Sequence, residues 1–395
     1  VDSLLIQTDS DGSAPTTGTL SSASNNTGIG KAVFTALTSG VANTAIGGDA
    51  LKANTTGQHN TSVGYDTLTV NTTGSYNTAM GTTALDANTT GGYNTGIGYR
   101  ALTANTTGSY NTALGYNALE LATTADNNVA VGRLALNATT TGTENTAVGS
   151  YALDVNTTGN YNTAVGKGAL GANTTANYNV AVGRNALSGT TTGAENVGVG
   201  DSALGNNSTG ANNVAVGQQA LQYNTTAANN AAVGLKALWK NTTGHSNIAV
   251  GYQALQAQTT GHNNTALGYQ AMYSTTTGNG RNTAVGRGSM YTNTTGYQNT
   301  AVGYDSMRSN TTGYMNTTVG ETSMHNNTTG IENAFFGYAA GHGNTTASSN
   351  AFIGAYSGNV NTTGASNTGC GHNTLRANTT GARNTGVGSG ALTAN

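Results

Sequence analysis

The chain is poor in charge, cysteine, proline and tryptophan. Only 7% of its 395 residues are charged, and it has one cysteine, one proline and one tryptophan. With 13 Lys and Arg against 15 Asp and Glu, it lacks the basic surface that nucleic acids and anionic membranes attract. The single Cys370 excludes a disulfide framework and a cysteine-based metal site. No run of about eighteen apolar residues occurs, so we expect no nucleic-acid partner and no membrane insertion.

Glycine, asparagine and threonine dominate instead, and they recur with a fixed period. The pattern N-x-x-x-G begins every 17 residues from Asn26 to Asn264, and after one inserted residue near Gly280 it continues from Asn282 to Asn384. The 22 units share the consensus N-T-A-V-G-x-x-A-L-x-x-N-T-T-G-x-x, whose residues are called positions 1 to 17. A fixed period of this kind is typical of solenoids, in which each unit buries its apolar face against its neighbours.

The consensus predicts strands and turns. A unit of 17 residues is too short for two helices, and Thr, Val and Gly are weak helix formers. We predict one strand over N-T-A-V, a second over x-A-L-x, and a return turn at N-T-T-G. The expected fold class is all-β, a repetitive parallel β-solenoid (β-roll) over residues 26–395, preceded by a cap or joining segment over residues 1–25. Because the last unit stops within its turn, we expect the solenoid to be truncated at its C-terminal end.

Four positions of the unit indicate how a coil is built. Asn at position 1 and Gly at position 5 occur in all 22 units, which predicts a ladder of stacked amides and a crowded corner with positive φ. Position 3 is small except at Phe335 and Phe352, and position 9 is large except at Gly341 and Gly358, which lie in the same two units. A residue gained at one position and lost at the other predicts that positions 3 and 9 touch in one packed compartment.

The strand is apolar on both faces. Position 4 is always Val, Ile, Leu, Met, Phe or Cys, although positions 3 and 4 point to opposite faces of a strand. One face can form the interior of the coil, and the other needs a second chain. We therefore predict a homo-oligomer whose chains lie parallel. Cys370 takes position 4, where we expect a buried small apolar side chain.

Two stretches carry a resemblance to known repeats. Residues 212–217 (N-N-V-A-V-G) and 246–251 (S-N-I-A-V-G) resemble the N-S-V-A-I-G signature of YadA-like trimeric autotransporter adhesin heads, and the unit N-T-A-V-G-Y-x-A-L is similar to repeats of phage tail fibre proteins. The resemblance covers residues 26–395 and implies a parallel, left-handed β-roll homotrimer that binds surfaces or host cells. The unit departs from those heads in its longer period, with the extra residues in the N-T-T-G turn.

Chemistry-bearing residues are sparse and scattered. The six histidines stand far apart at varied unit positions, and none forms a pair with metal-ligand spacing. Gly-x-Gly segments such as residues 96–98 open no helix, and residues 9–12 (D-S-D-G) lack the spacing of a calcium loop. We therefore predict no catalytic residue, no metal site and no cofactor, and expect that the chain is not an enzyme.

The N-T-T turn creates an N-x-T sequon in most units. One interpretation is a row of glycans, and the alternative is that Asn, Thr and Gly suit a tight turn and stack into polar ladders. The candidate glycan attachment sites are Asn54, Asn71, Asn88, Asn105, Asn156, Asn173, Asn207, Asn224, Asn241, Asn293, Asn310, Asn327, Asn344, Asn361 and Asn378.

Tyrosine recurs at positions 6 and 17, which also accept Lys, Arg, Asp and Gln. We therefore expect these side chains to be exposed, where they could stack on sugars or contact a receptor, with ordinary packing at the corner of the coil as the alternative. The candidate surface aromatic contacts are Tyr65, Tyr99, Tyr116, Tyr252, Tyr269 and Tyr304.

Together these features favour a structural function. We predict a segment of an extracellular or virion fibre that presents an adhesive surface, as an adhesin shaft or head or a tail fibre does, located outside the cell, at its surface or on a virion. The expected partners are further copies of the chain, as a trimer or filament, and a cell-surface or polysaccharide receptor. The alternatives are a self-polymerising, glycosylated extracellular filament and an ice-binding solenoid.

Overall fold

The computed structural model describes residues 3–6, 22–277 and 280–393 of the chain. The chain divides into two compact units, Val1–Glu195 and Asn196–Asn395. The described residues form strands, turns and bends, and no helix is found among them, so none of these residues belongs to a membrane-spanning helix. The all-β prediction is confirmed.

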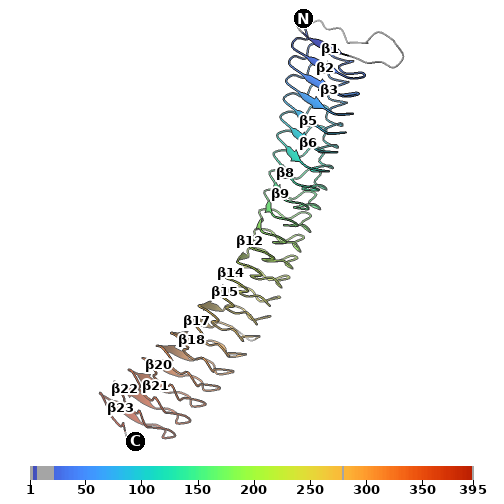
Figure 1. Cartoon of the computed structure of the whole chain (residues 1–395). Coiled ribbons are helices and arrows are strands. Elements are labelled where there is room, and N and C mark those ends of the chain that lie inside the picture. The colour runs from blue at the N-terminus through green and yellow to red at the C-terminus, as the bar shows by residue number, and fades with distance from the viewer. Residues whose placement is uncertain (1–2, 7–21, 278–279, 394–395) are drawn as a thin grey trace. The chain divides into compact units, whose positions relative to one another are not determined.

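The first unit is a stack of coils, each of which contributes one three-residue strand at positions 2 to 4 (Figure 1). Within this unit, consecutive strands pair in parallel and in register, as Thr163 does with Val180. The strands are β1 (Leu4–Ile6), β2 (Thr27–Ile29), β3 (Thr44–Ile46), β4 (Thr61–Val63), β5 (Thr78–Met80), β6 (Thr95–Ile97), β7 (Thr112–Leu114), β8 (Val129–Val131), β9 (Thr146–Val148), β10 (Thr163–Val165) and β11 (Val180–Val182).

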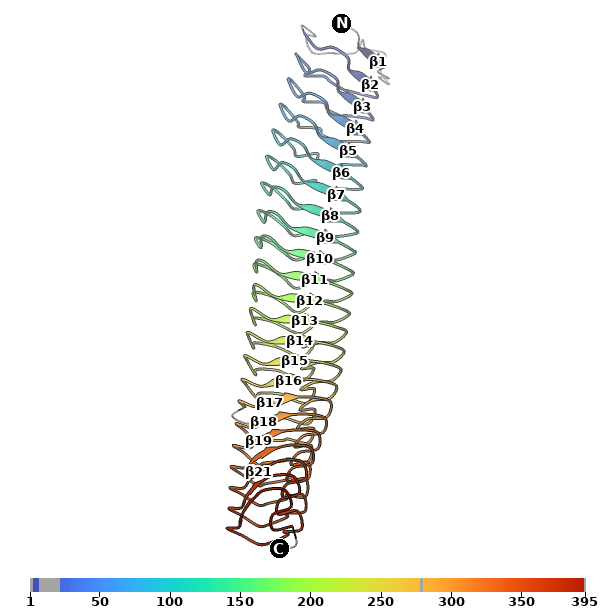
Figure 2. The ribbon, with the colours of Figure 1, turned by 90° about the vertical axis from the view of Figure 1, so that its left-hand side faces the viewer.

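The second unit repeats this arrangement, and its strands follow one another along one side of the stack (Figure 2). Its strands are β12 (Val197–Val199), β13 (Val214–Val216), β14 (Ala231–Val233), β15 (Ile248–Val250), β16 (Thr265–Leu267), β17 (Thr283–Val285), β18 (Thr300–Val302), β19 (Thr317–Val319), β20 (Ala334–Phe336), β21 (Ala351–Ile353), β22 (Thr368–Cys370) and β23 (Thr385–Val387). Both units are therefore parallel β-solenoids of 17-residue coils, as the period predicts.

The N-terminal segment also contributes to the stack. Strand β1 pairs with β2, with Leu4 opposite Thr27, so residues 4–6 add a strand ahead of the first complete unit. The rest of the predicted cap, including residues 9–12, lies largely outside the described residues.

The predicted second strand over x-A-L-x is wrong, because this segment consists of turns. Positions 7 and 9 adopt left-handed backbone, with φ of 55° at both Arg100 and Leu102. The N–H of Arg100 donates to the carbonyl of Thr82 in the preceding coil, and that of Leu102 donates to Ala118 in the following coil, at 3.1 and 3.0 Å. The left-handed residues thus let the segment bond to both neighbours without forming a strand. This conformation costs about 1–2 kcal/mol per residue with a side chain, so inter-coil bonding and packing must offset it.

The asparagine at position 1 and the glycine at position 5 fit successive coils together. The side-chain Oδ1 of Asn77 accepts the backbone N–H of Asn94 at 2.9 Å, and the Nδ2 of Asn94 donates to the carbonyl of Gly108 at 2.8 Å. The amide ladder at position 1 is therefore confirmed. At position 5, Gly98 has a φ of 137°, and a side chain there would overlap the backbone of Gly115 in the next coil. Glycine is therefore needed at this corner both for the positive φ and because a side chain has no space there.

The interior of each coil is formed by positions 3, 8 and 9. In a typical coil Ala113, Ala118 and Leu119 are completely buried. The small residues leave room for the leucine, so the core is thin and depends on matched volumes.

Positions 3 and 9 touch, as the exchange of large and small residues predicts. A Cβ added to Gly341 would overlap the ring of Phe335, and one added to Gly358 would overlap the ring of Phe352. Both phenylalanines are completely buried. The compartment therefore holds one large side chain, which either position can supply.

Candidate functional surfaces

The outward face of the strands is a row of apolar side chains open to solvent in the single chain. Position 4 is 44% exposed at Met80, 45% at Leu114 and 49% at Ile353, whereas position 3 is buried. The two apolar faces that the sequence predicts are therefore present. In the single chain Cys370 is exposed on this outward face, so the prediction of a buried thiol is wrong for the coil itself, because position 4 points away from the interior of that coil.

The six candidate tyrosines lie on the surface, as expected. Their exposed fractions range from 39% at Tyr252 to 57% at Tyr65. Neighbouring rings stack on one another, with centroids 5.5 Å apart for Tyr99 and Tyr116 and 5.1 Å apart for Tyr252 and Tyr269. The six residues thus line the turn after the strand, and contact with a receptor stays a prediction.

Ring stacking limits what these rows can bind. At position 17, the rings of His59, Tyr76, Tyr93 and Tyr110 form one row with centroid separations of 4.9, 4.9 and 5.0 Å and interplanar angles of at most 11°. Each inner ring therefore has both faces against its neighbours and presents only its edge and polar tip to solvent. No sugar ring fits between rings this close. A sugar can stack only at the end of such a row or where a ring is missing.

The candidate glycan acceptors lie in the interior. All fifteen asparagines are at most 2% exposed. In a typical case the Nδ2 of Asn88 donates to the carbonyl of Gly91 at 3.0 Å and to the Oδ1 of Asn71 in the preceding coil at 2.8 Å. A sugar on this nitrogen would remove a donor and need space that the coil does not have. This placement argues against glycans on the folded coil and favours the alternative of a turn stabilised by a polar ladder.

The described titratable residues with shifted pKa values do not converge on a common site. Burial raises the pKa of Asp86 and that of Asp154 above the usual range of a carboxyl group. Burial, together with the nearby His325, lowers the pKa of His342. These groups lie in different coils, and in the described part of the chain no three His, Cys, Asp or Glu side chains are grouped to hold a metal ion.

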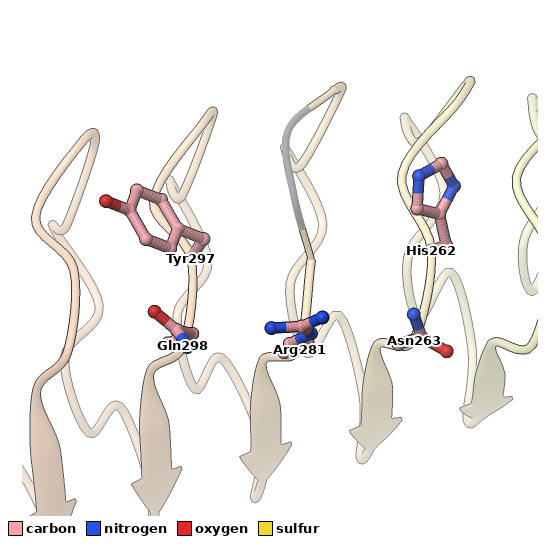
Figure 3. Close-up of a pocket in the computed structure, with 5 residues that line it drawn as sticks. All are labelled: His262, Asn263, Arg281, Tyr297 and Gln298. Carbon is pink, nitrogen blue, oxygen red and sulfur yellow. The ribbon is translucent and has the colours of Figure 1, made fainter.

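The interruption of the repeat creates a cavity in the second unit. It has a volume of about 370 Å³ and is lined by His262, Asn263, Arg281, Tyr297 and Gln298 (Figure 3). The insertion is visible in the sequence, but no site is predicted there. The available signal was the spacing of 18 residues between two successive position-1 asparagines, where all others are 17 apart.

The stacked coils and their exposed rows define a β-solenoid repeat protein. No protein-family model matches the chain, and no curated protein is similar to it in sequence. The resemblance to adhesin heads and tail fibre repeats therefore rests on the short motifs alone.

Proposed function

We propose that this chain is a segment of an extracellular or virion fibre that assembles from parallel copies, as a homotrimer, and presents an adhesive surface. The observation that carries the proposal is the apolar row at position 4, with side chains such as Leu114 and Ile353 almost half exposed. Apolar surface gains about 25 cal/mol per Å² when it leaves water. Continuous apolar patches on soluble proteins mark interaction sites. A row repeated in every coil is best covered by the same row of another copy.

The regularity of the row favours parallel, in-register association. Every coil presents position 4 at the same place, so two copies match over their length when their coils advance together. Cyclic symmetry buries the same row in each copy and leaves none uncovered. The number three comes from the resemblance to trimeric adhesin heads.

The ice-binding alternative gains no support from the threonines of the turn. At position 13 the hydroxyl of Thr89 donates to the carbonyl of Thr106 in the next coil at 2.9 Å, and Thr106 does the same to Thr123 at 3.0 Å. These hydroxyls are engaged within the chain and are not free to order a water lattice.

The mass in solution tests the assembly. Light scattering of the purified chain should give three times 39.4 kDa. Leu114→Lys with Val148→Lys places charges on the outward strand face and should give a monomer with an unchanged circular dichroism spectrum. The matched control, Tyr116→Lys with Ser150→Lys, adds the same charges two residues later and should remain trimeric. A wild-type monomer would refute the assembly, and indefinite filaments in negative stain would favour the polymerising alternative.

Cys370 offers a test of chain direction, since its thiol lies on the same outward face. In a parallel, in-register assembly the Cys370 side chains of different copies meet, so mild oxidation should produce disulfide-linked dimers on a non-reducing gel. Dilute Cys370→Ser protein should give none. An assembly that is stable in solution yet forms no such dimer would contradict parallel register.

A further inference from the structure

A row of stacked rings in the second unit lacks one member. Position 16 carries His245 and His262, whose ring centroids lie 4.6 Å apart, and further along it carries Tyr297 and Tyr314, 4.8 Å apart. The interplanar angle is 5° in both pairs. One coil separates the two pairs, and it supplies no ring.

The backbone of that coil places Gly280 at the missing position. Elsewhere the N–H of position 17 donates to the position-16 carbonyl of the preceding coil, as Tyr93 does to Ser75. Here Arg281 donates to His262 at 3.3 Å, and Gln298 donates to Gly280 at 3.0 Å. Gly280 thus stands between the two ring pairs.

No side chain can occupy position 280. The φ of Gly280 is 60°, and a Cβ there would overlap the carbonyl oxygen of His262. Two coil spacings of ~4.8 Å separate the coils that carry His262 and Tyr297 by roughly 9.5 Å. This gap, called the ring slot, fits one six-membered ring at the spacing of the rest of the row.

Among the described residues, each of the two rings that wall the ring slot stacks on a neighbouring ring through one face only. The outer face of His262 is covered by His245, and that of Tyr297 is covered by Tyr314. Figure 3 shows His262 and Tyr297 on the coils that flank Arg281, within the lining of the 370 Å³ cavity. The ring slot is therefore a place where a ring is missing between two stacked pairs of one row.

The floor of the ring slot is polar and carries a positive charge. Arg281, Asn263 and Gln298 lie nearer the strands than the two rings do (Figure 3). Within the described ranges, the ion pairs involve other residues, and no carboxylate pairs with Arg281. A guanidinium group binds a carboxylate through two parallel hydrogen bonds, and the two amides can bond to hydroxyl groups. His262 also leaves its Nδ1 buried without a hydrogen-bond partner.

We propose that the ring slot binds a six-membered ring that bears a carboxylate, as in a hexuronate unit of an acidic polysaccharide. The ring lies between His262 and Tyr297, and the carboxylate pairs with Arg281. Asn263 and Gln298 can bond to the hydroxyl groups of a pyranose, which an arene lacks. The proposal rests on the proposed function in that a polysaccharide is a receptor expected of an adhesive fibre, but the ring slot lies within one chain and needs no oligomer.

Calorimetric titration of the full chain tests the ligand class. Trigalacturonate should bind, and neutral trigalactose should bind at least about ten-fold more weakly because it leaves the guanidinium unpaired. Benzoate, which carries the same carboxylate on an arene, should bind more weakly than trigalacturonate. Tighter binding of benzoate would overturn the assignment to a sugar, and equal binding of the neutral sugar would overturn the role of the charge.

Matched ring variants test the location of the site. His262→Ala and Tyr297→Ala each remove a wall and should weaken trigalacturonate binding about ten-fold. His245→Ala and Tyr314→Ala remove the outer ring of the same pairs and should change it by less than about two-fold. Circular dichroism checks that all four variants fold. Equal effects of inner and outer rings would refute the ring slot.

Matched arginine variants test the charge. Arg281→Gln should weaken binding about ten-fold or more and make it insensitive to salt. Arg287→Gln is the control, because Arg287 lies over the rings of Tyr269 and Tyr304 and does not line the cavity. If both variants bind trigalacturonate equally well, Arg281 does not bind its carboxylate.

The two proposals can fail separately. A monomeric chain that binds trigalacturonate would refute the trimeric fibre and keep the ring slot. A trimer that does not bind it at millimolar concentration would refute the ring slot and keep the fibre.

Discussion

Two coils of the second unit have the same backbone conformation but take their large core side chain from different positions. In residues 299–315, Ala301 takes position 3 and Met307 takes position 9, whereas in residues 333–349 these positions hold Phe335 and Gly341. Their strands have the same length. Position 9 is left-handed in both coils, with φ of 55° at Met307 and 58° at Gly341. The backbone therefore does not depend on which position supplies the large side chain.

The features common to both coils fix that backbone. In each coil the position-1 amide, Asn299 or Asn333, accepts the backbone N–H of the next coil and donates to its own position-15 carbonyl. Both coils also have the glycine corner at position 5, where a side chain would overlap the next coil. The core must then supply only a fixed volume. Mutations should therefore be harmful when they change the volume and tolerated when they redistribute it.

The largest effect is expected when the volume is filled twice. Gly341→Leu would place a second large side chain where the ring of Phe335 already lies, so we expect a loss of more than about 4 kcal/mol in the free energy of unfolding. The measurement is the urea midpoint. In the other coil, Met307→Leu puts the same residue at the same position and should cost less than about 1.5 kcal/mol. Equal losses in the two variants would show that Phe335 does not fill the space that position 9 fills in the other coil.

A smaller effect is expected when the volume is emptied and then refilled. Phe335→Ala should cost about 3–4 kcal/mol, because it leaves a cavity beside Phe352, whose ring lies 5.0 Å away. Adding Gly341→Leu should recover most of this loss, to within about 1.5 kcal/mol of the wild type. The readout is again the urea midpoint, with Tyr338→Ala as an exposed control. If the two losses simply add, positions 3 and 9 do not share a compartment.

The exchange could be predicted from the sequence because repeats allow positions to be compared within one chain. Phe335 with Gly341, and Phe352 with Gly358, broke the consensus together and so revealed a contact. The ladder at position 1 and the corner at position 5 were predictable for the same reason. Each is an invariant residue with few physical uses.

The left-handed turns could not be predicted in this way. Leu102 and Arg100 are not residues that favour positive φ, so the x-A-L-x segment looked like a second strand. Their conformation is imposed by bonding to the coils on either side, which a single unit does not reveal. The side of the strand that Cys370 occupies was also missed, because two apolar faces look alike until one is known to be inside.

The ring slot could not be predicted from the sequence either. The insertion before Arg281 was visible, but the ring row that it interrupts depends on which residue takes position 16. That assignment needed the backbone hydrogen bonds of Arg281 and Gln298. The sequence alone allows the extra residue to be placed elsewhere in the turn.

A modest stabilisation is expected from relieving left-handed backbone. Ala339 at position 7 of the Phe335 coil has a φ of 50°. Ala339→Gly removes the cost of that conformation, about 1–2 kcal/mol, but increases the freedom of the unfolded chain, so we expect a net gain of up to about 1 kcal/mol. Its neighbour Ala340 has no positive φ, and Ala340→Gly should lose about 1 kcal/mol. A loss in both variants would mean that the left-handed residues are not strained.

The smallest effect concerns pH and again separates the two coils. At position 10 the Phe335 coil carries His342, stacked on His325 at 5.1 Å, whereas the 299–315 coil carries Arg308. Burial and the nearby His325 lower the pKa of His342 in the folded chain. The unfolded chain, with an ordinary histidine pKa of about 6.5, therefore takes up this proton first as the pH falls. Stability is full above that value and decreases as the pH falls through it towards the lower folded pKa.

His342→Gln should reduce the change of the urea midpoint between about pH 7.5 and 5. His372→Gln, which replaces an exposed histidine outside this pair, should leave that change as it is in the wild type. An unchanged slope in His342→Gln would mean that the stacked pair does not cause the loss of stability in acid.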